Sequence, residues 1–417
     1  MIDFPQISVW SVLIALLIAA APGCAVESPI VEPANVDVGS ERLTVTGLTL
    51  YTAPDAQPLI NATVVMADGK IEAISQGRPE QIVGPQIAAD GKVATAGLVN
   101  SHVHFTQPRV LVDPQAELNQ MLLQYGFTQV VDTGSDPSAT VQLRKQIKAG
   151  KLVGPRIFMA NGSFVGPGGS PAYLPGIQLP QITKTEQAQP MVRAVLNLGA
   201  DAIKIFSGSF ISPEKTVYIE PDVIQAVVTA THAADALVFA HPTTVQGLST
   251  AVDAGVDVIA HTTAPEVEIS SATLAKMRAQ DTALMPTLKL WRYEMNRLQL
   301  GKSVADQMEQ AAVAQLRLLL DANITILFGT DVGYMADYDP AAEYRLMHQA
   351  GMSWRDILRS ATSAPAALLG SGSGTVTVGE PADLAIYAAD PTLDVANFAQ
   401  LSHTIIEGKV AWSKPAD

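Results

Sequence analysis

The sequence predicts an α/β protein in which a parallel (β/α)8 TIM barrel carries a small β-sandwich built from the two ends of the chain. Two patterns predict this fold. Residues 95–370 alternate short apolar runs with amphipathic stretches of helical period, and β-rich segments flank them at 41–94 and 371–417. Apolar runs without polar alternation are typical of parallel strands that are buried on both faces. A chain of 417 residues with 48% hydrophobic residues is long enough to bury such a core.

Eight apolar runs are the expected barrel strands, and the stretches between them are the expected helices. Several of those stretches end at glycine or asparagine, which are favoured just after the last turn of a helix. A doubly wound open sheet is the alternative, but no glycine-rich phosphate loop follows the first run. The expected strands are 96–99, 128–132, 156–160, 202–206, 237–240, 256–260, 283–285 and 324–328. The expected helices are 113–125, 140–149, 185–198, 220–234, 243–254, 271–280 and 303–322.

The two flanking segments are rich in Val, Thr and Ile, and neither is long enough to close a core by itself. Pairing them in one β-sandwich is the economical way to bury their apolar faces. Tight turns at Asp68-Gly69 and Gly408-Lys409 would join neighbouring strands. The expected strands are 43–51, 62–66, 70–74, 384–387, 403–407 and 410–412.

The first residues predict export. Residues 9–21 form an apolar run of 13 residues, too short to span a bilayer comfortably but as long as a signal-peptide core. Cys24 follows after Pro-Gly, an order that resembles a bacterial lipoprotein signal. We therefore expect residues 1–24 to be an export signal with a lipidated Cys24, and 25–40 to be a flexible tether of a periplasmic or cell-envelope lipoprotein. Because no Lys or Arg precedes the run, plain secretion and an uncleaved anchor are the alternatives.

Composition excludes several partners and metal sites. The net charge is −14, and no block of Lys or Arg occurs, which argues against binding nucleic acid or anionic lipid through a basic face. Membrane contact is therefore expected only through the N-terminal signal or its lipid. A single cysteine excludes an internal disulfide and a cysteine-based zinc site, so a metal would need His, Asp, Glu or Lys-derived ligands. A monomer and a homo-oligomer both fit this composition.

Residues of metal-ligand type gather at the ends of the expected strands. Two histidines at a spacing of two point to the same side of an extended chain, and the carboxyl ends of barrel strands carry the active sites of such folds. Each residue alone has a structural explanation, such as a helix cap for the aspartate, but an unpaired lysine in an apolar strand costs several kcal/mol. Their coincidence at one end of one barrel predicts a metal site. The residues are His102, His104, Lys204, His241, His261 and Asp331.

These motifs resemble the amidohydrolase superfamily. The matching segments are Gly97 to His104, Gly199 to Lys204, the two later histidines, Gly329-Thr-Asp331 and Gly379 to Leu384, and the resemblance covers about residues 43–412. The most similar branch is the imidazolonepropionase-like group that includes Xaa-Pro and Xaa-Arg dipeptidases. The motifs are specific for the superfamily and uninformative about the substrate.

The resemblance implies two divalent metal ions. His102, His104 and Asp331 would bind the first ion, His241 and His261 the second, and a carbamate on Lys204 would bridge both. Nitrogen and oxygen ligands suit Zn²⁺, with Mn²⁺ or Co²⁺ as alternatives. The chain departs from the family at Ala260, where Glu often precedes the last histidine. Imidazolonepropionase itself lacks the bridging lysine, so Lys204 argues against that activity.

The implied chemistry is hydrolysis of an amide bond in dipeptides or N-acyl amino acids. A hydroxide shared by the two ions would attack the carbonyl, with Asp331 as catalytic proton shuttle. Lactones, phosphotriesters and cyclic amides are alternative substrates, and a surface solute-binding lipoprotein is the non-enzyme alternative. Loops after the strands would contact the small-molecule substrate through Ser163, Tyr173, Ser207, Lys289, Arg292 and Tyr334.

Lys289 and Arg292 would bind a substrate carboxylate, unless they are solvated or paired with Glu294. Three further histidines are expected to be structural. They are His232, His348 and His403.

Overall fold

The computed structural model describes residues 42–415, apart from five positions. These are Val83, Gln107, Pro108, Glu266 and Ser373. The expected signal 1–24 and tether 25–40 lie outside the described residues. Within the described residues, no helix combines the length and apolar character that crossing a bilayer requires.

Seven parallel strands form the wall of a barrel, and their order in space follows their order in the chain. Each strand pairs in parallel with the next, so the sheet has no switch point of the doubly wound kind. The barrel prediction is confirmed, and the open-sheet alternative was wrong. The strands are β6 (Leu98–Val103), β7 (Phe127–Asp132), β8 (Arg156–Phe164), β9 (Ala202–Phe206), β12 (Leu237–His241), β13 (Val258–Ala260) and β14 (Ala283–Met285).

An irregular segment takes the eighth position and nearly closes the barrel. On one side, Leu327 N donates to Leu284 O at 2.8 Å, and on the other Ser101 N donates to Phe328 O at 2.8 Å. Beyond that point, Asp331 N donates to His102 O at 2.9 Å. Asp331 itself has φ +61°, which bends the chain out of strand geometry. The segment expected as an eighth strand therefore forms isolated bridges.

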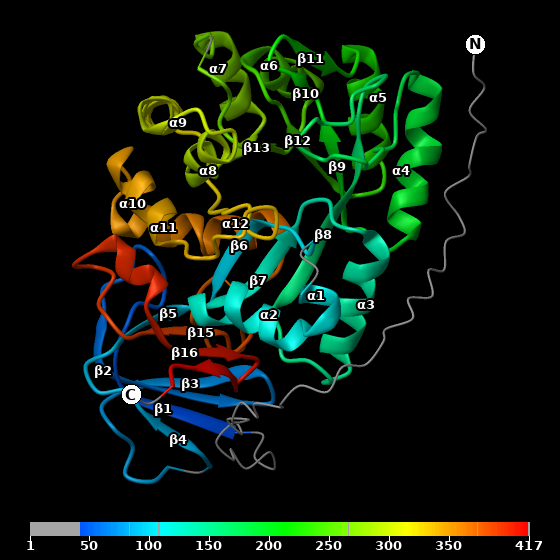
Figure 1. Cartoon of the computed structure of the whole chain (residues 1–417). Helices are drawn as coiled ribbons and strands as arrows, with labels where there is room; N and C mark the ends of the chain where they lie inside the picture. Colours follow the sequence, from blue (N-terminus) through cyan, green and yellow to red (C-terminus); the bar gives the residue numbers. More distant parts are fainter. Residues whose placement is uncertain (1–41, 83, 107–108, 266, 373, 416–417) are drawn as a thin grey trace, which may run out of the picture. The chain divides into compact units, whose positions relative to one another are not determined.

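The helices surround the barrel (Figure 1). Three of them begin with proline after an acidic residue, as Asp113-Pro114 and Asp136-Pro137 illustrate, because proline has no N–H to leave unpaired and the aspartate accepts a helix N–H. The bounds are α1 (Arg109–Val112), α2 (Pro114–Met121), α3 (Pro137–Lys148), α4 (Ala188–Asn197), α5 (Pro221–His232), α6 (Val245–Ala254), α7 (Ser271–Ala279), α8 (Lys289–Arg297), α9 (Lys302–Asp321), α10 (Ala341–Gln349), α11 (Trp354–Ser360) and α12 (Ser363–Leu369).

Helix α8 corrects the sequence analysis, which expected a substrate-binding loop there. Its first N–H groups have no capping side chain nearby in the sequence. Instead Glu343, which lies in α10, accepts hydrogen bonds from Leu288 N at 2.8 Å and Lys289 N at 2.9 Å. A cap that is supplied from more than fifty residues away leaves no local pattern in the sequence.

Strands from both ends of the chain join one separate sheet, in the order β17-β16-β15-β5-β1-β2-β3, with β4 beside β1. The antiparallel pair β5–β15 connects the two ends, with Ala96 opposite Leu384. In Figure 1 these blue and red strands lie side by side. Their bounds are β1 (Arg42–Leu50), β2 (Leu59–Ala67), β3 (Lys70–Gln76), β4 (Gln86–Ala88), β5 (Val93–Ala96), β15 (Leu384–Tyr387), β16 (Leu401–Ile406) and β17 (Lys409–Ser413).

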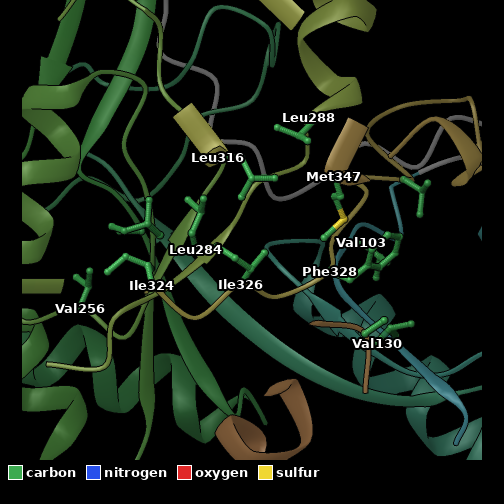
Figure 2. Packing of buried hydrophobic residues seen from close by; sticks show 14 of the residues in the cluster. Val103, Val130, Val256, Leu284, Leu288, Leu316, Ile324, Ile326, Phe328 and Met347 are labelled. Carbon is green, nitrogen blue, oxygen red and sulfur yellow. The ribbon is translucent and has the colours of Figure 1, made fainter. Parts of the chain in front are cut away.

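The core lies between the barrel strands and their helices, as Figure 2 shows. Leu284 from β14 and Ile326 from the eighth position pack with Leu316 of α9, and all three are almost fully buried. Burial of each such side chain stabilises the fold by about 1.5–3 kcal/mol. This packing supports the barrel strands, and the candidate site is built on their ends.

Candidate metal centre

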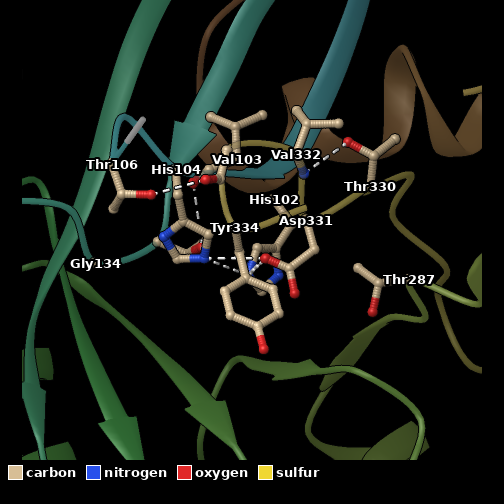
Figure 3. Close-up of polar contacts among 12 residues, drawn as sticks. His102, Val103, His104, Thr106, Gly134, Thr287, Thr330, Asp331, Val332 and Tyr334 are labelled. Carbon is tan, nitrogen blue, oxygen red and sulfur yellow. Dashed lines mark hydrogen bonds and ion pairs between the residues drawn. The ribbon is translucent and has the colours of Figure 1, made fainter. Parts of the chain in front are cut away.

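The first cluster comes from two neighbouring barrel positions. His102 and His104 lie at the carboxyl end of β6, and their Nε2 atoms are 3.3 Å apart. Asp331 Oδ1 lies 3.4 Å from Nε2 of His102 and 3.1 Å from Nε2 of His104. Figure 3 shows the two imidazoles and the carboxylate pointing toward one another. Three groups with lone pairs therefore converge on one point.

This donor set fits a divalent cation. Burial, and then the charge of Lys204, hold the pKa of His102 well below its ordinary value, so its imidazole is neutral. His102 Nδ1 and Asp331 Oδ1 are buried and lack hydrogen-bond partners. Ligand atoms held about 2.1 Å from one ion lie roughly 3.0–3.4 Å apart in octahedral or tetrahedral coordination. The spacing in this cluster falls close to that range.

Two more histidines approach the cluster from the opposite wall. The rings of His241, at the end of β12, and His261, directly after β13, have centroids 4.8 Å apart. The His261 ring is 4.6 Å from that of His102, and its Nδ1 is 4.0 Å from Asp331 Oδ2. Ligand atoms of His102, His261 and Asp331 all lie within 4.8 Å of one another. Burial is also the main reason that the pKa of His261 is well below its ordinary value.

Lys204 lies in the middle of β9 and is 2% exposed. Burial lowers its pKa to about 8, while the charges of Asp331 and Asp132 act in the opposite direction. Among the described residues, none forms a hydrogen bond with its Nζ. A neutral amine is the form that adds carbon dioxide, and this environment favours that form.

Two glycines and the side-chain amide of Asn100 allow the segment that carries Asp331 to lie close to β6. A Cβ on Gly333 would lie 1.6 Å from His104 O, and one on Gly329 would lie 2.9 Å from the His102 Cβ. Asn100 Nδ2 donates to Thr330 Oγ1 at 2.7 Å. The glycines on either side of Asp331 are thus required by the close approach of its segment to β6.

Asp132, at the end of β7, was missed by the sequence analysis. Its Oδ1 accepts from Ser135 Oγ at 2.6 Å, and that hydroxyl accepts from Phe105 N at 2.7 Å. This chain fixes the backbone just after His104. Burial raises the pKa of Asp132, and hydrogen bonds from Ser135 and Thr140 oppose that shift. An acidic residue that ends an apolar run was the available signal.

The expected substrate residues divide into two groups, and the first lies near the cluster. The Tyr173 ring is 6.3 Å from the His241 ring and 5.6 Å from the Tyr334 ring. Ser207 Oγ donates to His241 O at 3.3 Å. Ser163 is 7% exposed and lies within β8, since that strand continues past the expected end at 160.

The second group is held away from a substrate by acidic partners. Lys289 Nζ donates to the main-chain oxygens of Asp337 at 3.0 Å and Asp339 at 2.7 Å, and it pairs with the Asp337 carboxylate at 3.1 Å. Arg292 bonds to Asp306 at 2.8 Å and Glu309 at 2.6 Å. Arg292 therefore does not pair with Glu294 as the sequence analysis considered, and neither cation is available for a substrate carboxylate in this conformation.

The expected structural histidines have local partners. His232 Nε2 lies 2.9 Å from Asp257 Oδ2, and His348 Nδ1 lies 2.8 Å from Met352 O. His403 Nδ1 lies 3.1 Å from Ser402 Oγ. None of these three lies in the cluster of ligand atoms around Asp331.

Comparison with known proteins finds one matching family model and several solved structures of the same fold. Residues 93–411 match the model of the amidohydrolase family. No curated protein sequence matches the chain. Among solved structures, a Xaa-Pro dipeptidase with methionine bound in its active site is 21% identical, with a TM-score of 0.80 over 89% of this chain and 100% of that chain.

Two other solved structures share the fold. A putative prolidase from Bifidobacterium longum is 25% identical, with a TM-score of 0.76 over 89% of this chain and 95% of that chain. The A. niger ochratoxinase is 18% identical, with a TM-score of 0.72 over 89% of this chain and 96% of that chain.

Proposed function

Because this chain belongs to the amidohydrolase family, whose members hydrolyse carbon–nitrogen bonds, we propose that it cleaves the amide bond of dipeptides or N-acyl amino acids. The observation that carries this proposal is the convergence of imidazoles and a buried carboxylate at the mouth of the barrel. The solved dipeptidase and the putative prolidase support dipeptides as the substrate class.

We assign the ligands by their proximity. His102, His104 and Asp331 would hold one divalent ion, and His241 and His261 a second, with Zn²⁺ best suited to this set. Bound ions of this kind polarise a carbonyl and lower the pKa of water toward neutrality. Lys204, once carbamylated, would offer an oxygen to each ion. In that step the neutral amine forms a bond to the carbon of CO2, one C=O π bond opens to give the carbamate oxygen, and the nitrogen loses a proton to solvent.

Asp331 is the proposed proton shuttle. Its carboxylate is 4% exposed, and its Oδ1 has no hydrogen-bond donor among the described residues. It can therefore accept a proton from the attacking water and deliver it to the leaving nitrogen. Tyr173 and Tyr334 lie on the substrate side and offer aromatic faces to an apolar side chain.

A hydrolysis screen tests this proposal. The purified full-length protein, supplied with Zn²⁺ and bicarbonate, is incubated with Xaa-Pro dipeptides, other dipeptides and N-acyl amino acids, and the released amino acid is measured. Lactones, phosphotriesters and cyclic amides are tested in parallel, and their hydrolysis products are measured. We expect release from one of these classes and none from the Asp331→Asn variant. Activity confined to lactones, phosphotriesters or cyclic amides would reject the proposed substrate class. Solute binding without turnover would reject the enzyme.

Lys204 has its own test, because carbamylation is observable. With ¹³C-bicarbonate and Zn²⁺, the wild type should give a carbamate resonance that Lys204→Ala lacks. The variant should also bind one zinc ion less tightly. Equal zinc binding and equal turnover in the two proteins would favour a site in which Lys204 is not a ligand.

We further propose that the enzyme is exported and anchored through a lipid on Cys24, on the strength of the apolar run that ends just before it. Labelled palmitate should enter the wild type in a bacterial host and not enter Cys24→Ser. An unlabelled, secreted wild type would point to plain secretion instead.

A further inference from the structure

Two threonines each connect a proposed ligand histidine to a main-chain carbonyl. Thr287 Oγ1 lies 2.6 Å from His261 Nδ1 and donates to Pro286 O at 2.9 Å. Thr243 Oγ1 lies 3.2 Å from His241 Nε2 and donates to Gly208 O at 2.8 Å. The same device thus occurs after β14 and after β12. Figure 3 shows the Thr287 side chain on the Asp331 side of the cluster.

Counting protons ties the direction of these hydrogen bonds to the tautomer of each histidine. A hydroxyl has one proton, and a carbonyl oxygen can only accept. When the threonine O–H donates to the carbonyl, the hydroxyl oxygen can only accept from the imidazole. The facing ring nitrogen then carries the hydrogen, which is Nδ1 in His261 and Nε2 in His241. A neutral imidazole has one N–H, so Nε2 of His261 and Nδ1 of His241 keep their lone pairs.

The backbone at both threonines indicates that the surroundings impose this arrangement. Thr287 has φ +45° and Thr243 has φ +58°, a region that β-branched residues rarely adopt. Such a conformation persists only where neighbouring contacts enforce it. Next to Thr287, the buried Glu343 accepts from the N–H groups of Leu288 and Lys289. The positive φ turns each hydroxyl back toward a carbonyl and a histidine at once.

We propose that Thr287 and Thr243 are positioning residues that set the tautomers of His261 and His241, so that Nε2 of the first and Nδ1 of the second face the metal ions. The metal-facing part rests on the proposed function, whereas the tautomers themselves do not. Partners of this kind orient ligand histidines, and their loss typically costs 10–100-fold in metal affinity.

The test reads the tautomers directly in metal-free protein. Only seven histidines are present, so ¹⁵N-histidine labelling gives a spectrum that single-histidine variants can assign. Two-bond ¹H–¹⁵N correlation separates N–H from lone-pair nitrogens in each ring. We expect Nδ1–H in His261 and Nε2–H in His241 of the wild type. The opposite tautomers in the wild type would overturn the inference without any substitution.

Substitutions then test the cause. Thr287→Val keeps the shape and removes the hydroxyl, and Thr287→Ser restores it. We expect the valine variant to lose the single Nδ1–H tautomer of His261 and to bind its weaker zinc ion about 10–100-fold less tightly, with rescue by serine. Thr243→Val and Thr243→Ser should act likewise on His241.

Thr282→Val is the matched control, because Thr282 is also buried and donates to a main-chain oxygen, Val256 O at 3.0 Å, away from the cluster. It should leave the tautomers and the zinc affinity unchanged. Unaltered tautomers in folded Thr287→Val and Thr243→Val would overturn the inference. A wild type that binds no zinc would instead overturn the proposed function and the metal-facing part with it.

Discussion

Asp331 and Asp383 are both buried aspartates, but they lie at opposite edges of the barrel and have opposite surroundings. At the amino edge, Asp383 Oδ1 accepts from Glu407 N at 2.9 Å, and its other oxygen bonds to Arg156, the first residue of β8. At the carboxyl edge, Asp331 faces imidazoles, and its Oδ1 has no hydrogen-bond donor. A carboxylate that is fully paired stabilises the fold, whereas one held among imidazole nitrogens is suited to a cation.

The residue types that adopt a positive φ also differ between the candidate site and the rest of the molecule. Away from the site, non-glycine residues with positive φ are mostly Asn and Asp in turns, such as Asp68 and Asn323, which tolerate that conformation. At the carboxyl edge, two of the residues with positive φ are threonines, Thr243 and Thr287, and a β-branched residue rarely adopts this conformation. The other three are Ser163, His261 and Asp331. Strain of this kind is typical of functional sites.

The largest expected effect comes from Asp331. Asp331→Asn removes the charge that, in the proposed mechanism, would balance the metal ions and accept the proton, so kcat should fall by a factor of about 10³ or more. Thermal stability without metal should fall little, because the carboxylate is poorly paired. Steady-state kinetics and a thermal scan in EDTA measure both. Retained activity in this variant would contradict the proposal that Asp331 is the proton shuttle.

Glu343 is a third buried carboxylate that can be compared with Asp331 and Asp383. It accepts hydrogen bonds from the main-chain N–H groups of Leu288 and Lys289. Burial raises its pKa to about 7. Between the ordinary value of 4.5 and 7, the folded state therefore binds more protons than the unfolded state, and the unfolding free energy falls as pH rises. Relative to Glu343→Gln, the wild type should lose at most about 3 kcal/mol over this window. Urea unfolding of metal-free protein at several pH values measures the difference, and parallel curves would contradict it.

Asp383→Asn is expected to affect stability and leave catalysis alone. The asparagine keeps an acceptor for Glu407 N but loses the charge opposite Arg156, which should cost about 1–3 kcal/mol of unfolding free energy. Zinc content and kcat of the folded protein should match the wild type. A large loss of kcat in correctly folded Asp383→Asn would mean that the two edges of the barrel are coupled.

The smallest expected effect is at Arg292. Its bonds to Asp306 and Glu309 join α8 to α9 near the surface, where an ion pair contributes about 1 kcal/mol or less. Arg292→Ala should therefore change KM by less than about twofold. A KM increase of tenfold or more with kcat unchanged would restore Arg292 as a partner of a substrate carboxylate.

The sequence by itself determined the strands and the residues that gather at their ends. The predicted bounds of β9 and β14 agree with the structure, because a buried parallel strand is a short local run of apolar residues that polar residues terminate. The same locality placed His102, His104, His241, His261 and Asp331 just beyond such runs. The structure brings these side chains together at one edge of the barrel.

Only the tertiary structure decided which partner each polar side chain has. Lys289 was expected to face a substrate, but residues some fifty positions away provide carbonyls for its amine. Helix α8 exists where a loop was expected, since Glu343 caps it from another helix. Thr287 and Thr243 gave no sequence signal, because their role depends on a positive φ and on a histidine and a carbonyl brought close in space. Apolar periodicity is a property of neighbours in the chain, whereas hydrogen-bond partners are a property of neighbours in space.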